Sequence, residues 1–318
     1  MSRFDIKMVQ AEVPPPRLLL YGDPGVGKTT FAASGIDPII IATESGAQGV
    51  DVYRLPNEGV CNDWGELMEC VDVLAGGKHD RKTVAVDTVN QAVTLCEEYV
   101  CKRDFGGVWN PTRGQEGFNS YGKGNFAVAQ EIKKLLNKLD KLQNQGVMVI
   151  LCAHTGQHKV ANALGSDYTA FGADVPKQSW AVLSSWADQI AHATSVVRTV
   201  SREGEKVKAI SGGSERWMIF EPEPGRIVKS RAGYEMPPKV LFDYSSYSAA
   251  LKTDVVGDLI GRAVELYQQV GSDDQKIVAD KLGLPKKKSF SAEAFSGLGK
   301  QKLDSLVNWL MSKRIEDN

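Results

Sequence analysis

The sequence contains no long run of apolar residues. Its longest apolar runs, 38–42 and 147–153, have the length of a β-strand, far below the roughly 20 residues that a helix needs to cross a bilayer. The amino-terminal segment 1–7, Met-Ser-Arg-Phe-Asp-Ile-Lys, carries no apolar secretory core. We therefore expect a protein of the cytoplasm with no membrane partner.

The sequence also lacks closely spaced cysteine pairs, and its net charge is close to zero. The five cysteines form no Cys-x-x-Cys pair, which predicts reduced thiols and argues against a disulfide framework or a zinc knuckle. The net charge is -1, so any contact with nucleic acid must rely on locally concentrated basic groups. With 318 residues and 42% hydrophobic content, the chain has room for one large α/β domain and an appendage.

What the chain does have is a glycine-rich loop at residues 22–30, directly after the apolar run 18–21. Its glycines allow the backbone to wrap an anion, so that successive N–H groups and the next helix N-terminus point at one phosphate. Lys28 would reach the β and γ phosphates, and the Thr29 hydroxyl would complete a magnesium shell. This Walker A pattern predicts binding of a nucleoside triphosphate by Gly22, Asp23, Pro24, Gly25, Val26, Gly27, Lys28, Thr29 and Thr30.

The remaining pattern predicts an α/β fold. Strand-like runs end near Tyr21, Ala42, Asp87 and Cys152, with helix-compatible stretches between them, and this alternation indicates a mainly parallel sheet with helices on both faces. Runs near 196–200, 207–210 and 217–221 are separated by turn residues, which predicts antiparallel strands that extend the sheet at one edge.

A domain boundary is expected near residues 245–253. The segment Ser-Ser-Tyr-Ser there precedes a helical tail with apolar stripes at 256–267 and 303–310. We therefore assign residues 1–244 to the core and 245–318 to a small helical carboxyl-terminal region. The basic run 285–288 between the two stripes favours a solvated connection.

The run 82–88 supplies a second half for the nucleotide site. It is an apolar strand that ends in Asp87, where a Walker B carboxylate would hold magnesium together with Thr29. A GTPase would need Asp-x-x-Gly here, which is absent, and Asn-Lys-x-Asp later. The tetrapeptide 137–140 matches the latter, but it lies inside the amphipathic helix predicted over 128–143. No motif distinguishes adenine from guanine.

Two more polar residues end strands on this side of the predicted sheet. Glu44 follows the run 39–42, and His154 follows 147–153, so both strand tips would face the nucleotide. His154 and His158 stand four apart as helical metal ligands do, but they leave a strand and have no third ligand, which argues against zinc.

With these motifs in this order, the chain resembles the RecA-like recombinase and ATPase superfamily over roughly residues 15–244. It resembles more closely the compact phage-encoded members associated with single-strand-annealing recombination. The resemblance implies that Glu44 polarises the attacking water and that His154 senses the γ-phosphate, in place of the more usual glutamine. It also implies that Lys229 or Arg231 enters the active site of a neighbouring subunit, so that hydrolysis depends on assembly into a ring or filament.

The resemblance further implies that two segments face single-stranded DNA. They are 103–126 and 156–177, in which aromatic and basic residues alternate on a glycine-rich backbone, a composition suited to base stacking and phosphate contact. The candidates for DNA contact are Arg103, Trp109, Arg113, Tyr121, Lys123, Lys159 and Lys177.

We therefore expect a magnesium-dependent ATPase that binds single-stranded DNA and acts as a homo-oligomer in phage DNA recombination or annealing, in the host cytoplasm. A single-strand-binding protein is a further expected partner. The main alternative is a nucleotide-dependent switch or loader that acts on a protein partner in DNA replication or repair through the helical tail. A small-metabolite kinase is disfavoured because no lid-like arginine cluster follows His154.

Overall fold

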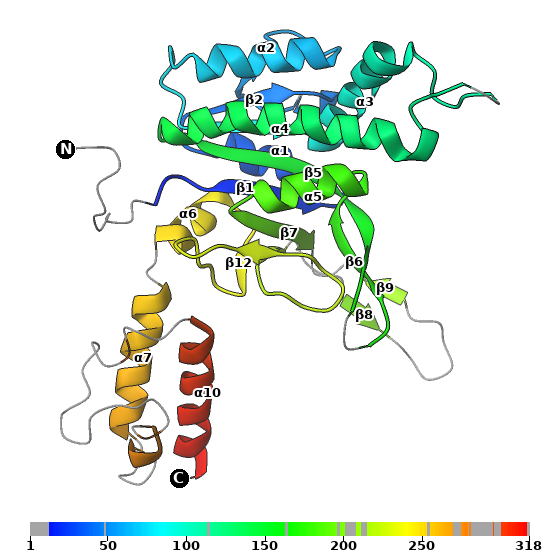
Figure 1. The fold of residues 1–318 in the computed structure, drawn as a ribbon. Coiled ribbons are helices and arrows are strands. Elements are labelled where there is room, and N and C mark those ends of the chain that lie inside the picture. Colours follow the sequence, from blue (N-terminus) through cyan, green and yellow to red (C-terminus); the bar gives the residue numbers. More distant parts are fainter. Residues whose placement is uncertain are drawn as a thin grey trace, which may run out of the picture. The chain divides into compact units, whose positions relative to one another are not determined.

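Figure 1 shows the computed structural model of the chain. The structure describes residues 13–47, 49–112, 115–162, 165–195, 198–200, 208–210, 215–252, 255–269, 275–278, 280, 295 and 300–316. The chain divides into two compact units, Met1–Ser248 and Ala249–Asn318. The division falls inside helix α6 (Tyr244–Lys252), whereas composition placed the boundary after residue 244.

The first unit is built on one large sheet, whose main strand order is β12-β10-β7-β1-β5-β4-β2-β3. Its parallel strands are β1 (Arg17–Gly22), β2 (Pro38–Ala42), β3 (Tyr53–Leu55), β4 (Thr83–Asp87), β5 (Met148–Val160) and β7 (Gln189–Ser195). Antiparallel pairing adds β10 (Arg216–Ile219), β11 (Lys229–Ser230) and β12 (Lys239–Leu241). The predicted α/β class, with a mainly parallel sheet and an antiparallel edge extension, is therefore confirmed.

Strand β5 separates β1 from β4. In register, Leu20 of β1 and Asp87 of β4 both lie opposite Cys152 of β5. Because these strands run parallel, their carboxyl ends meet at one edge of the sheet, which is where open α/β sheets bind ligands.

Four helices bury one face of the sheet in a single apolar cluster. Leu19 and Tyr21 of β1 belong to it, and the period of two along a strand directs Leu18 and Leu20 to the opposite side. The helices of the cluster are α2 (Trp64–Ala75), α3 (Val89–Phe105), α4 (Lys123–Asn144) and α5 (Lys177–Trp186).

Helix α4 confirms the amphipathic pattern read from the sequence. Its apolar stripe, from Val128 and Ile132 to Leu139 and Leu142, is buried. The tetrapeptide 137–140 lies within this helix, so it cannot form the base-reading loop of a GTPase.

The five cysteines of this unit are buried free thiols.

Two strand expectations need correction. The strand expected to end at His154 does not end there, because β5 continues to Val160 and pairs antiparallel with β6 (Tyr168–Ala173). The two form a ribbon that projects beyond the sheet (Figure 1). Strands β8 (Arg198–Val200) and β9 (Lys208–Ile210) pair with each other in a separate two-stranded sheet. Among the described residues, β10 is therefore the one of the three expected edge strands that extends the main sheet.

The second unit contains the long helices α7 (Val255–Gln269) and α10 (Lys300–Glu316). They share an apolar core of Ala263, Leu266, Tyr267, Val278, Phe295, Leu303, Val307 and Leu310. The basic run 285–288 lies outside the described residues. Across the described ranges of both units, no helix has the length and apolarity to span a membrane.

Candidate nucleotide site

The phosphate loop, residues 22–30, joins β1 to the short helix α1 (Lys28–Ala33). Gly25 and Gly27 have φ angles of 79° and 107°, a left-handed region that favours glycine. A Cβ on Gly22 would lie 2.6 Å from the carbonyl oxygen of Ala193, so this position has no room for a side chain. The glycines therefore permit both the turn and its close packing against β7.

The side chain of Lys28 folds back across this loop. Its Nζ donates to the carbonyl oxygens of Gly22 at 2.8 Å and Asp23 at 3.1 Å. Burial lowers the pKa of Lys28, and the charges of Asp87 and Glu44 oppose that shift. A buried ammonium group held by neutral carbonyls is suited to bind an anion that enters the loop.

The hydroxyl of Thr29 donates to a carboxylate oxygen of Asp87 at 2.6 Å. Asp87 is buried, and its burial raises the carboxyl pKa, as does the charge of Glu44, whereas the Thr29 hydrogen bond lowers it. This pair offers the hard oxygen ligands that Mg²⁺ prefers. Within the described ranges no group of three or more His, Cys, Asp or Glu could hold a metal ion.

Glu44 and His154 meet beside this pair. His154 Nε2 lies 3.4 Å from Glu44 Oε1, and Thr88 Oγ1 donates to Glu44 Oε2 at 3.2 Å. The hydroxyl of Thr43 donates to the Thr88 carbonyl oxygen at 2.7 Å. Strands β2 and β4 end here, whereas β5 continues past His154, and together the three strands bring Glu44, Asp87 and His154 to one place.

Asn90, in the first turn of α3, is a member of the site that the sequence analysis missed. Its Oδ1 accepts from the His154 backbone N–H at 2.8 Å, and its Nδ2 donates to the Asp174 carbonyl oxygen. Asn90 thereby holds both strands of the β5–β6 ribbon where they leave the sheet. The available signal was its place three residues after Asp87, at the start of a helix.

Arg216 was also missed. It belongs to β10, and its Nη1 donates to the carbonyl oxygen of Val26 inside the phosphate loop at 2.8 Å. An arginine in a short edge strand carries no local pattern that would reveal this contact.

Lys229 and Arg231 are not brought to the phosphate loop. Lys229 pairs with Ile190 near the amino end of β7, whereas Gly22 of the loop lies opposite Ala193. Lys229 Nζ instead donates to three carbonyl oxygens at the carboxyl end of α5, those of Ser184 (2.8 Å), Ser185 (3.2 Å) and Ala187 (2.6 Å). Cations stabilise a helix at this end because its last carbonyls lack partners.

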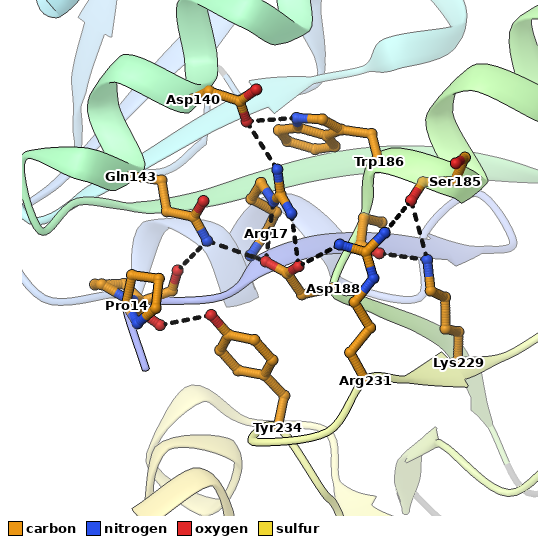
Figure 2. A network of polar contacts seen from close by, with 12 residues as sticks. Pro14, Arg17, Asp140, Gln143, Ser185, Trp186, Asp188, Lys229, Arg231 and Tyr234 are labelled. Atoms are coloured by element: carbon orange, nitrogen blue, oxygen red, sulfur yellow. Dashed lines mark hydrogen bonds and ion pairs between the residues drawn. The ribbon is translucent and has the colours of Figure 1, made fainter. Parts of the chain in front are cut away.

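Arg231 belongs to the polar network in Figure 2. Its Nη1 lies 3.0 Å from Asp188 Oδ1, and its Nη2 donates to the Ser185 carbonyl oxygen. Asp188 also binds the guanidinium of Arg17 at 2.7 Å. Burial would raise the pKa of Asp188, but the Arg17 hydrogen bonds outweigh it and lower the pKa. Within the chain, both Lys229 and Arg231 therefore stabilise the junction of α5 and β7.

The first segment of DNA candidates is largely engaged within the chain. Arg103 pairs with Asp104 and the buried Glu131, and Lys123 pairs with Glu116 at 2.6 Å. Trp109 packs against Phe118, with 39% of its surface exposed, whereas Tyr121 is 97% exposed. Arg113 lies outside the described residues.

The second segment places its candidates on two elements. Lys159 lies on the β5–β6 ribbon and pairs with Asp167 at 3.1 Å. Lys177 begins α5. The structure does not bring these two lysines to the phosphate loop, and their contact with DNA stays a prediction.

These observations define a class of protein. A strand, a glycine loop and a helix that opens with Lys-Thr, with a carboxylate from β4 on the threonine hydroxyl, constitute a P-loop nucleoside-triphosphate-binding domain. Residues 14–232 match the family model described as an AAA domain, and the chain belongs to that family. No curated protein matches the chain.

Proposed function

We propose that this protein is a magnesium-dependent ATPase of the RecA-like type that binds single-stranded DNA and works as an oligomer in phage DNA recombination or annealing. The observation that carries the proposal is the convergence of Glu44 and His154, 3.4 Å apart, beside the Thr29–Asp87 pair. A carboxylate at a strand tip next to the phosphate loop is placed to act on a water that attacks a γ-phosphate.

In the proposed reaction Lys28 turns from its carbonyl acceptors to the β and γ phosphates. Magnesium, held by Thr29 and Asp87, would neutralise charge between these phosphates. Glu44 orients the attacking water. The Thr88 hydroxyl donates a hydrogen bond to one carboxylate oxygen of Glu44 and so fixes its position. His154 contacts both the γ-phosphate and Glu44. Loss of the γ-phosphate would therefore change the contacts of His154, where the β5–β6 ribbon leaves the sheet.

The DNA-binding part of the proposal draws support from exposed aromatic side chains. Tyr168 and Phe171 on the ribbon are 42% and 43% exposed, and Tyr121 and Phe126 near the start of α4 are 97% and 61% exposed. Base stacking on such rings contributes about 1–3 kcal/mol per base. The ribbon follows His154 directly in the chain, which would link DNA contact to the nucleotide.

The oligomeric part of the proposal rests on the charge that develops on the transferred phosphoryl group. Phosphoryl transfer gains from a cation beyond the loop lysine, often supplied by a neighbouring subunit. Lys229 and Arg231 remain the proposed donors in trans, but each would have to leave the carbonyl oxygens at the end of α5.

The test is ATP hydrolysis measured over a range of protein concentrations, with and without single-stranded DNA. We expect turnover per subunit to rise with concentration and to rise again with DNA, because DNA orders the ribbon and assembly completes the site. The Lys28→Ala variant is the background control. Turnover unaffected by both variables would refute the oligomeric and DNA-dependent parts of the proposal.

The alternative is a nucleotide-dependent switch or loader that acts on a protein partner. The second unit supports it, because this unit has an apolar core of its own. ATP turnover that ignores DNA but responds to a purified replication or repair protein would favour this alternative.

A further inference from the structure

A cleft of about 330 Å³ opens beside α1, next to the phosphate loop. One part of its wall comes from the loop and α1, the other from β10 and the β12–α6 junction. The lining residues are Gly27, Thr30, Phe31, Ser34, Arg216, Phe242, Asp243, Tyr244 and Ser245. The last four lie beyond residue 232, where the family match ends, so the family assignment does not account for this cleft.

We infer that the cleft receives the nucleoside part of the bound nucleotide and that Arg216 positions it against the phosphate loop. This inference rests on the proposed function. Gly27 and Thr30 belong both to the loop and to the cleft, so a phosphate chain that fills the loop directs its nucleoside there. The volume lies at the lower end of the roughly 300–1,000 Å³ found for small-molecule sites.

Arg216 of β10 contacts the phosphate loop directly. Its Nη1 donates to the Val26 carbonyl oxygen at 2.8 Å, and a Cβ on Gly27 would collide with that nitrogen. The absence of a side chain at Gly27 is therefore what admits the guanidinium. An arginine has five N–H donors on a planar group that stacks on rings, so the contact with Val26 leaves donors and a flat face for a ligand.

The wall opposite the loop is aromatic. Phe242 stacks on Phe31 with centroids 5.2 Å apart and planes 12° apart, and Tyr244 lies 5.6 Å from Phe31. The guanidinium carbon of Arg216 lies 6.0 Å from the Phe242 ring. Aromatic side chains beside hydrogen-bonding groups are typical of sites that bind a flat heterocycle.

Asp243 is the one acidic residue in the lining. Its Oδ1 accepts from Ser245 Oγ at 2.6 Å and from the Ser246 backbone N–H at 2.8 Å. Burial would raise the pKa of Asp243, but these hydrogen bonds outweigh it and hold the pKa below its usual value. The carboxylate is thus ionised at neutral pH and can accept a hydrogen bond from a ribose hydroxyl or a base amino group.

The experiment compares two ligands, Mg-ATP and tripolyphosphate, which carries the phosphates without a nucleoside. Ser34 is exposed at the end of α1, so Ser34→Trp fills the cleft without disturbing a core. We expect this variant and Arg216→Ala to lose about 10- to 100-fold in ATP affinity, the scale of one or more charge-assisted hydrogen bonds. Tripolyphosphate affinity should change far less.

The matched control is Thr94→Trp, at an exposed position on α3, which should leave both affinities unchanged. Wild-type affinity for ATP in both Ser34→Trp and Arg216→Ala would overturn the inference, and so would an equal loss of both ligands in Ser34→Trp. A wild-type protein that binds neither ligand would instead contradict the proposed function itself.

Discussion

The Thr29 hydroxyl and the Asp87 carboxylate are joined by a 2.6 Å hydrogen bond across 58 positions of the chain. Strand β5 lies between the two strands that precede them, so the bond spans a whole strand at the carboxyl edge of the sheet. It connects the phosphate loop to the acidic strand end and brings the two expected magnesium ligands into contact.

Replacing Asp87 with Asn should weaken ATP binding only when magnesium is present. The amide keeps the size of the side chain but loses the charge that attracts the cation, and we expect a loss of about tenfold or more. Binding titrations with magnesium and with a chelator measure the effect. Thr29→Ser, which keeps the hydroxyl, is the matched control and should retain most of the magnesium dependence.

The same carboxylate predicts a pH dependence. Burial raises the pKa of Asp87, so its ionised form is lost at a higher pH than that of an ordinary aspartate. Magnesium-dependent ATP affinity should therefore fall as the solution is made mildly acidic. An Asp87→Asn variant with the same pH profile as the wild type would show that another group is responsible.

A variant of Lys229 can distinguish a structural role of this residue from a catalytic one. The Lys229→Met change keeps the aliphatic stem but removes the ammonium that binds three carbonyl oxygens of α5. We expect the free energy of unfolding to fall by about 1–3 kcal/mol, which denaturant unfolding measures. ATP turnover per folded subunit decides between the two proposed donors in trans. Lost turnover would assign that role to Lys229, and turnover at the wild-type rate would leave it to Arg231.

His192 predicts a loss of stability in acid. It stacks on Tyr21 with ring centroids 4.8 Å apart, and burial, assisted by the charge of Arg226, lowers its pKa from 6.5 to about 4. Between these values the unfolded chain binds a proton that the folded chain does not, so stability decreases as pH falls through this window.

The variant His192→Phe keeps the ring and removes the titration. Melting temperatures measured across the same pH window should decline less steeply in this variant than in the wild type. Identical slopes would mean that the acid sensitivity has another source.

Much of the fold and part of the site could be predicted because the signals were local. The glycine loop, the Asp87 strand and the stripe of α4 each depend on neighbouring residues. Predicting Glu44 and His154 required one further inference, which is that the carboxyl ends of neighbouring parallel strands meet at one edge of the sheet. The structure places both beside the Thr29–Asp87 pair.

The rest depends on contacts that no local pattern encodes. Lys229 and Arg231 give the same sequence pattern whether they face solvent, a neighbouring subunit or the end of α5. The alternating residues of 155–160 resemble a polar loop, and only pairing with β6 makes them a strand. Arg216 reaches the loop because β10 docks on β7, a tertiary event far from residue 26 in sequence.

The most direct test of the central claim is the Glu44→Gln variant, assayed for ATP binding and for ATP turnover beside Lys28→Ala. Glutamine keeps the shape of residue 44 but cannot accept a proton from water, so turnover should fall by about 100-fold or more while Mg-ATP affinity stays near that of the wild type. Lys28→Ala should lose affinity as well. Turnover at the wild-type rate in Glu44→Gln would contradict the account.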